Sequence, residues 1–321
     1  MLNMRILVGL LILPAFGPAQ HTTTVVFEGL QRSNPGASFD HGYVAAWALD
    51  PVHRVTLYAP DGHPMFQVSS FELPDGTHTN VVLSVAIDSD GTSAYVYQAA
   101  SGMRSGIAIL DTNGNQIRVI EMEPYEPSQV CFAPDHSLWT FGEQWKNNAP
   151  SLSDFMTFRH YLRDGKLLGS FVPRSALPDW QGGGLDQVVG PVVGHWRLRA
   201  SKDRIGAALF IGASKQTWVE LNLDGQLLGQ WTYSTLNHEA GTPAAFDSNG
   251  KLYGERWEDG KPAGISVFER SEGSWQPISL FSKGHLLGAD GVRLVFQSGD
   301  ALQWIEIDNE GSGQSAAVTQ H

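Results

Sequence analysis

Cysteine is almost absent from this sequence of 321 residues: Cys131 stands alone, so the chain cannot form an internal disulfide. Cys131 lies in the apolar run Val130–Ala133, which predicts a small buried side chain in a strand. Basic residues are also few, with 21 Lys and Arg against 33 Asp and Glu and a formal net charge of −12. Nucleic acids and anionic membranes require a cationic surface, so this balance argues against both as partners. Because no disulfide can form within the chain, the folded state must depend on a packed core.

No apolar run is long enough to cross a bilayer as a helix, but a shorter run stands near the N-terminus. Arg5 precedes the apolar run Ile6–Leu13, and small residues follow it up to Ala19. This order is typical of a signal peptide over residues 1–19, cleaved after Ala19. It predicts an exported protein, periplasmic or extracellular, with no membrane insertion after cleavage. The alternative is an N-terminal helix in the core.

Residues 81–122 have the pattern of four short strands joined by tight turns. The predicted strands are Val81–Ile87, Thr92–Gln98, Gly106–Leu110 and Gln116–Glu121. The turns between them contain Asp, Asn and Gly, which favour hairpins because these residues tolerate positive φ. Four antiparallel strands of this length make one blade of a β-propeller.

The same pattern recurs along the chain. The turn of the second hairpin in each repeat falls at Asp61, Asn113, Asp164, Asp224 and Glu272, with a weaker one near Glu310. The spacing is that of a four-stranded blade, so we predict an all-β, six-bladed propeller over residues 20–310. Residues 23–28 are expected to supply the last strand and close the ring, which removes exposed sheet edges. Residues 31–40 are predicted to be a turn-rich loop and residues 311–321 a disordered tail, and the protein is expected to be a monomer.

Several motifs carry a family resemblance. AIDSDG (86–91), AYVYQ (94–98), GIAILDTNGNQIRVI (106–120) and AAFDSNGKLYG (244–254) resemble the blades of the six-bladed NHL-repeat and gluconolactonase-like superfamily. The resemblance implies a ring whose loops, on one face, bind proteins, nucleic acid or small ligands. In some members a divalent metal in the central channel makes the ring a hydrolase or lyase. Because binders and enzymes share this fold, the fold does not choose between them.

Residues just before the inner strand of each blade are expected to converge on one mouth of the channel. These positions include Asn80, Gln129, His238, Glu239 and His285. His238 and Glu239 are the best candidate pair for a metal, zinc or calcium, with the other three as further ligands. The alternative is that these polar side chains solvate a water-filled channel.

Two stretches interrupt the repeats and form a second candidate site. Residues 142–160 delay a hairpin, and residues 173–194 are the longest segment without periodicity. They carry four aromatic residues, Trp145, Phe155, Phe158 and Trp180. Exposed aromatic residues on loops are typical anchors of binding surfaces, so these four are candidates for a contact patch. Alternatively, they hold the inserts against the ring.

The sequence contains no Gly-x-Ser-x-Gly elbow and no His-Glu-x-x-His motif. The leading hypothesis is an exported, non-catalytic propeller that binds a protein or small ligand on the loop face carrying the two inserts. The alternative is a metal-dependent hydrolase, similar to a lactonase, with its site in the central channel. A purely structural module of the cell envelope is a third possibility.

Overall fold

The computed structural model describes residues 22–27, 30, 35–48, 54–79, 81–98, 104–146, 149–150, 154–178, 198–210, 215–234, 242–258, 261–278, 280 and 284–307. The predicted signal peptide and tail lie outside this part of the chain, so both stay predictions. None of the helices among the described residues has the length and apolar character that crossing a membrane requires.

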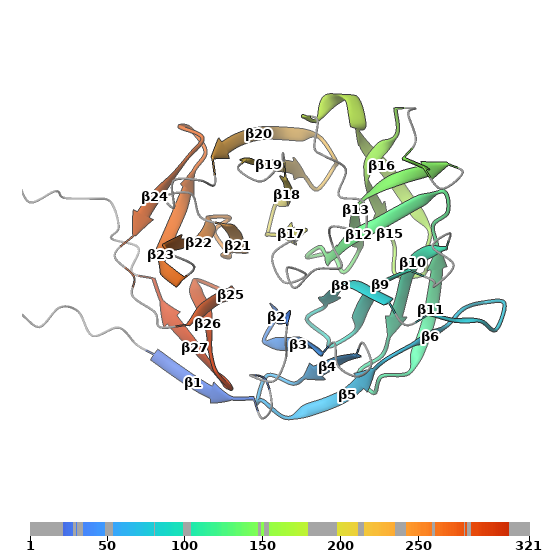
Figure 1. Ribbon diagram of the computed structural model, residues 1–321, viewed down its shortest axis with the longest axis horizontal. Coiled ribbons are helices and arrows are strands. Elements are labelled where there is room, and N and C mark those ends of the chain that lie inside the picture. Colours follow the sequence, from blue (N-terminus) through green and yellow to red (C-terminus); the bar gives the residue numbers. More distant parts are fainter. Residues whose placement is uncertain are drawn as a thin grey trace, which may run out of the picture.

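Six antiparallel sheets stand around one axis, which confirms the predicted six-bladed β-propeller (Figure 1). Blade 1 contains β2 (Pro35–Asp40), β3 (Tyr43–Ala48), β4 (Arg54–Tyr58) and β5 (Pro64–Val68). Blade 2 contains β8 (Val81–Ile87), β9 (Ser93–Gln98), β10 (Ser105–Leu110) and β11 (Gln116–Glu121). Blade 3 contains β12 (Tyr125–Phe132), β13 (Leu138–Lys146), β15 (Met156–Tyr161) and β16 (Leu167–Pro173), and β14 (Ala149–Pro150) pairs with β13.

The second half of the ring repeats this order. Blade 4 contains β17 (Arg199–Ala200), β18 (Arg204–Phe210), β19 (Lys215–Asn222) and β20 (Leu227–Ser234). Blade 5 contains β21 (Thr242–Phe246), β22 (Leu252–Glu258), β23 (Lys261–Glu269) and β24 (Ser274–Ile278). Blade 6 contains β25 (His285–Asp290), β26 (Arg293–Ser298), β27 (Ala301–Glu306) and β1 (Thr22–Val26). The hairpin of β6 (Phe71–Glu72) and β7 (His78–Thr79) connects blades 1 and 2, and the 3₁₀ turn η2 (Arg174–Ala176) follows β16.

The N-terminal strand closes the ring. β1 pairs antiparallel with β27, from Thr22 opposite Ile305 to Val26 opposite Ala301. Phe27 follows directly, is fully buried, and its N–H donates to the Asp300 carbonyl at 2.7 Å. The predicted closure by residues 23–28 is confirmed, since the first described strand completes the blade built from the last three.

The hydrophobic core lies between the blades. Each of six buried clusters joins residues of two neighbouring blades, so every interface around the ring has its own core. In β9 and β10 nearly every residue is buried, because neighbouring blades cover both faces of the sheet. Cys131 is buried in the cluster between blades 3 and 4, as its apolar run predicted.

One contact recurs from blade to blade. A residue of an outer strand packs on the glycine in the turn between the third and fourth strands of the next blade. Gly225 shows why that position requires glycine, since its φ is +83° and an added Cβ would lie 2.0 Å from the Phe171 ring. The equivalent contacts are Phe66 with Gly114, Ile120 with Gly165, Trp231 with Gly273, and the Val26 carbonyl with Gly62.

Two sequence-based expectations are wrong in detail. Residues 31–40 were expected to be a loop, but Pro35–Asp40 form β2, the inner strand of blade 1. Residues 142–160 were expected to be one insert, but β13 continues to Lys146 and β15 starts at Met156. In both places the pairing partner, rather than local propensity, decides that the chain is extended.

Candidate functional site

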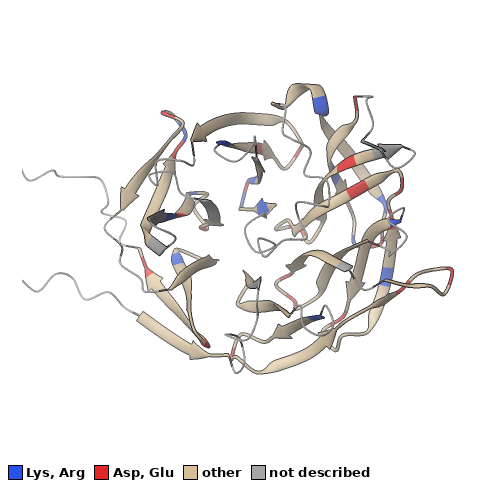
Figure 2. Cartoon of the chain, in the orientation of Figure 1, with Lys and Arg blue, Asp and Glu red and all other residues tan. Residues whose placement is uncertain are grey.

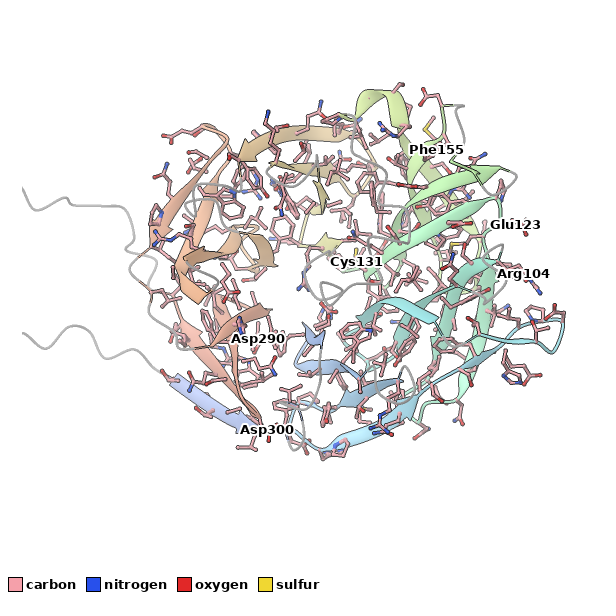
Figure 3. All side chains as sticks on the ribbon, in the orientation of Figure 1. Arg104, Glu123, Cys131, Phe155, Asp290 and Asp300 are labelled. Atoms are coloured by element: carbon pink, nitrogen blue, oxygen red, sulfur yellow. The ribbon has the colours of Figure 1, made fainter. Side chains whose placement is uncertain are left out.

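A cavity of about 420 Å³ lies on the axis of the ring. All six inner strands line it near their C-terminal ends. Each blade contributes one of the following residues: Asp40, Ile87, Phe132, Ala200, Phe246 and Asp290. Figure 3 labels Cys131 and Asp290 on two of these strands. The sequence predicted a site at the opposite end of the channel, where the inner strands begin. This cavity opens among the turns that join first and second strands, and the predicted site at the other end stays a prediction.

Arg199 links three blades across the cavity. It projects from β17 of blade 4, and its Nη1 donates to Asp40 Oδ1 at 3.1 Å in blade 1. Its Nη2 donates to the Leu287 carbonyl at 3.0 Å in blade 6. Arg199 is 8% exposed, and this burial lowers the pKa of the guanidinium while Asp40 opposes the shift. No sequence motif marks Arg199, because its partners are distant in the chain.

The charges that line the cavity are largely balanced. Asp40 faces Arg199, and Asp290 forms an ion pair with Arg293. Asp247 accepts the N–H groups of Asn249 and Lys251, at 2.9 and 2.8 Å, within its own turn. Figure 2 shows acidic and basic positions of the described chain spread around the ring, over several blades and loops. A cavity of this kind suits a polar ligand with little net charge.

Two groups on the cavity wall have defined chemistry. His41 Nδ1 lies 3.0 Å from the Ile87 carbonyl, which accepts its proton and leaves Nε2 as an acceptor in the neutral ring. Burial raises the pKa of the Cys131 thiol well above its usual value, and Asp40 adds to the effect. A thiol held in the protonated form is a poor nucleophile and a poor metal ligand.

The predicted mouth residues are only partly described. Asn80, His238 and Glu239 lie outside the described residues. Gln129 lies in β12 and is 4% exposed, and its Oε1 accepts no hydrogen bond from any residue that the structure describes. His285 starts β25, on the inner edge of blade 6. Among the described residues, no three His, Cys, Asp or Glu side chains form a group that could hold a metal.

His285 has a buried acidic neighbour that the sequence did not reveal. Its Nδ1 lies 3.6 Å from Glu255 Oε2, and hydrogen bonding to Glu255 raises the pKa of the imidazole. Glu255 is 5% exposed, and its Oε1 accepts the Leu286 N–H at 3.2 Å. Glu255 belongs to β22 of the preceding blade, so the pair joins blades 5 and 6. β22 reads LYGERWE and carries three charged residues, so no local signal in the sequence singles out Glu255.

A second acidic position lies at the start of β12. Glu126 is the Cα partner of Glu143 in β13. Burial raises the pKa of Glu126 to about 7, and the like charges of Glu143 and Glu123 add to the shift. A carboxyl group with this pKa exchanges its proton near neutral pH.

The four predicted contact aromatics are unlike one another. Trp180 and the side chain of Trp145 lie outside the described part of the structure. Phe155, labelled in Figure 3, is 7% exposed, and Phe158 is fully buried with its ring 5.0 Å from that of Phe141. Side chains buried to this extent offer no surface to a partner. Phe155 and Phe158 therefore fit the alternative, in which they hold the insert against the ring, better than a contact patch.

No family model and no curated protein matches the chain. Several solved structures are similar in fold. A protein of unknown function from Bacteroides caccae is 13% identical, with 79% of this chain and 81% of that chain covered and a TM-score of 0.45. The WD40 β-propeller domain of Doa1 is 13% identical, with 90% and 97% covered and a TM-score of 0.43. An oligogalacturonate lyase in complex with manganese is 10% identical, with 90% and 91% covered and a TM-score of 0.42. At this identity the likeness concerns the fold alone.

Proposed function

We propose that the protein is an exported, non-catalytic propeller that binds a small polar ligand in its central cavity. The observation that carries this proposal is the cavity of about 420 Å³ lined by all six blades. Ligand pockets in proteins have volumes of about 300–1,000 Å³ and combine apolar walls with a few polar groups. Asp40, His41 and Lys202 supply polar groups here, while Phe132 and Phe246 supply apolar wall.

A matched pair of turns provides the test. Asp247–Gly250 and Asp88–Gly91 occupy equivalent positions in blades 5 and 2, and each has serine second. Both serines are exposed, but Ser248 lines the cavity and Ser89 does not. Thermal-shift measurements against neutral sugars, zwitterionic amino acids and nucleosides should find a class that raises Tm, because a ligand that binds only the folded state stabilises it. Ser248→Trp should abolish this shift and Ser89→Trp should retain it. A shift that survives Ser248→Trp, or no shift in any class, would reject the proposal.

The loop face with Trp145 and Trp180 is the other place where we propose that a protein or small ligand binds. Its support is the position of the two inserts in the sequence, since both tryptophan side chains lie outside the described residues. The relation to NHL-repeat and gluconolactonase-like propellers is likewise proposed, on the turn motifs that blades 2 and 5 share.

The alternative function is a metal-dependent hydrolase, with His238 and Glu239 as its candidate metal ligands. Elemental analysis of the purified protein tests it directly. Zinc or calcium at one equivalent, lost in Glu239→Ala, would favour the hydrolase over the binding protein.

Export is part of the proposal and rests on the order of charged, apolar and small residues over 1–19. Sequencing the N-terminus of the protein recovered outside the cytoplasm should give Gln20 as the first residue. Recovery of the full-length chain from the cytoplasm alone would contradict export.

A further inference from the structure

Arg199 has a hydrogen-bond donor that no residue of the described chain uses. Its side chain lines the central cavity and is 8% exposed. Nη1 donates to Asp40 Oδ1 at 3.1 Å and Nη2 donates to the Leu287 carbonyl at 3.0 Å, but Nε has no acceptor among the described residues. A buried donor without an acceptor is costly, and most buried donors have one. The position of Arg199 therefore favours a ligand that brings an acceptor into the cavity.

Asp40 supplies a matching acceptor in the same ion pair. Its Oδ1 accepts the bond from Arg199, whereas no described residue donates to its Oδ2. The Asp40 side chain is partly exposed and lines the same cavity. Because a bond of 3.1 Å joins the two side chains, the unused donor and the unused acceptor must lie close together. The ion pair thus offers a ligand one donor and one acceptor at a single place.

We infer, on the basis of the proposed ligand-binding cavity, that its ligand is a free α-amino acid with an apolar side chain. The α-carboxylate accepts from Arg199 Nε, and the α-ammonium donates to Asp40 Oδ2. One carbon atom joins these two groups of the ligand, so they suit a donor and an acceptor that belong to one ion pair. Hydrogen bonds between charged groups are about twice as strong as those between neutral groups.

The cavity wall suits an apolar side chain. Inner strands of four blades contribute apolar residues to it, namely Val85, Ile87, Val130, Phe132 and Phe246. Burial of an apolar side chain against such a wall adds to the affinity that the charged groups provide. The zwitterion itself carries no net charge, in keeping with the balanced charges of the lining.

The other charged groups on the wall have less need of a ligand. Asp247 accepts two N–H groups of its own turn, and Asp290 forms an ion pair with Arg293. Lys202 also lines the cavity but is exposed, so water satisfies its ammonium group. Among the charged side chains described on the wall, the buried Nε of Arg199 is the donor that most needs an acceptor.

Calorimetric titration of the full chain with three ligands tests the inference. L-Leucine carries both charged groups, 3-methylbutylamine lacks the carboxylate, and 4-methylpentanoate lacks the ammonium. L-Leucine should bind with one-to-one stoichiometry, and each of the other two should bind at least about tenfold more weakly, since hydrogen bonds to charged groups contribute this much. Either fragment binding as tightly as L-leucine would overturn the inference.

Two variants assign the contacts. Arg199→Lys keeps the positive charge but lacks Nε, so it should weaken L-leucine about tenfold and leave 3-methylbutylamine unchanged, because that amine has no carboxylate. Asp40→Asn should weaken L-leucine and 3-methylbutylamine but not 4-methylpentanoate. Arg104→Lys is the control, since Arg104 forms ion pairs with Asp75 and Glu121 and does not line the cavity. A change that affects the three ligands equally would indicate a structural effect and reject the contact.

Circular dichroism confirms that each variant folds, and the comparison of the three ligands on the parent protein stands if neither variant does. The Ser248→Trp variant separates this inference from the cavity function. If a neutral sugar or a nucleoside raises Tm through the cavity and L-leucine does not bind, the cavity function holds and the amino acid is wrong. Binding of L-leucine that Ser248→Trp leaves unchanged would place the amino acid outside the cavity. Binding by none of these ligands would reject both.

Discussion

Gly225 shows how much one residue contributes to the fit between blades. Its φ of +83° strains any side chain, and an added Cβ would also collide with Phe171 of the preceding blade. Gly76 has a similar φ of +79° but no atom within 4 Å of the Cβ position, so it isolates the backbone effect. Gly76→Ala should lower the free energy of unfolding by about 1–2 kcal/mol. Gly225→Ala should lower it by about 2–5 kcal/mol, because overpacking adds to the strain.

Urea unfolding of both variants measures the difference. Phe171→Leu in the Gly225→Ala background should recover part of the loss, because the smaller side chain gives the Cβ room. Equal losses in the two glycine variants would show that the contact with Phe171 adds nothing.

Glu126 makes stability depend on pH. Its pKa is raised from 4.5 to about 7, so the folded state binds a proton that the unfolded state releases at lower pH. The stabilising effect is complete below the unfolded pKa and is lost as pH rises through the folded one. Glu126→Gln should therefore match the parent protein at about pH 4 and exceed it in unfolding free energy at about pH 8. The size of the gain is limited because Glu126 remains half exposed.

Urea unfolding at several pH values checks this dependence. Glu306→Gln, which alters an exposed carboxylate of blade 6, should leave the pH profile parallel to that of the parent protein. A Glu126→Gln profile that is also parallel would contradict the raised pKa.

At the scale of elements, β1 is the non-covalent closure of the ring. Thr24 and Gln303 are cross-strand partners in β1 and β27. Replacing both with cysteine should allow a disulfide that fastens the two ends of the propeller and raises stability by about 5 kcal/mol, since a long closed loop restricts the unfolded chain most. Thr56 and Gln67 are partners within one hairpin and form the control. The disulfide between them closes a short loop and should contribute about 3 kcal/mol or less.

Thermal unfolding with and without reductant measures both disulfides. Each gain should disappear on reduction. The result would contradict the prediction if the hairpin disulfide stabilised the protein more than the closure disulfide. In that case β1 is already fixed in the unfolded ensemble, or the closure disulfide strains the native strand pair.

The elements that sequence predicts well are those with strong local signals. Asp-Gly and Asn-Gly turns around β8 to β11 predicted all four strands of blade 2 within a residue or two of their observed ends. β2 was missed because Pro35, Gly36, Ser38 and Asp40 have low strand propensity. Its extended form depends on pairing with β3, whose residues Val44–Trp47 are buried.

The candidate sites could be predicted from the sequence less well than the strands. Gln129 and His285 were expected just before the inner strands, a rule that depends on topology alone. The structure places Gln129 inside β12 and His285 at the start of β25. The cavity and the pair of Glu255 with His285 arise where separate blades meet, and the residues that form them are far apart in the chain. Their spacing in the sequence does not show that these side chains meet, because the contact depends on how the blades are arranged around the ring.

At the scale of the whole molecule, Arg199 connects blades that do not adjoin in sequence. It joins blade 4 to Asp40 in blade 1 and to Leu287 in blade 6, so its loss affects the ring across its axis. Arg199→Met should lower the free energy of unfolding by about 2–4 kcal/mol, because the variant leaves Asp40 charged without its partner inside the channel. Adding Asp40→Asn should restore part of this loss.

Arg293 provides the control for that measurement, because its ion pair with Asp290 lies within blade 6 and is more exposed. Arg293→Met should cost less than about 1 kcal/mol. Urea unfolding followed by fluorescence should show one cooperative transition for each protein, displaced to lower urea in Arg199→Met, since the blades share every core cluster with a neighbour. Equal costs for Arg199→Met and Arg293→Met would mean that the link across the channel is no stronger than a surface ion pair, and the ring would then owe its closure to the blade interfaces and β1 alone.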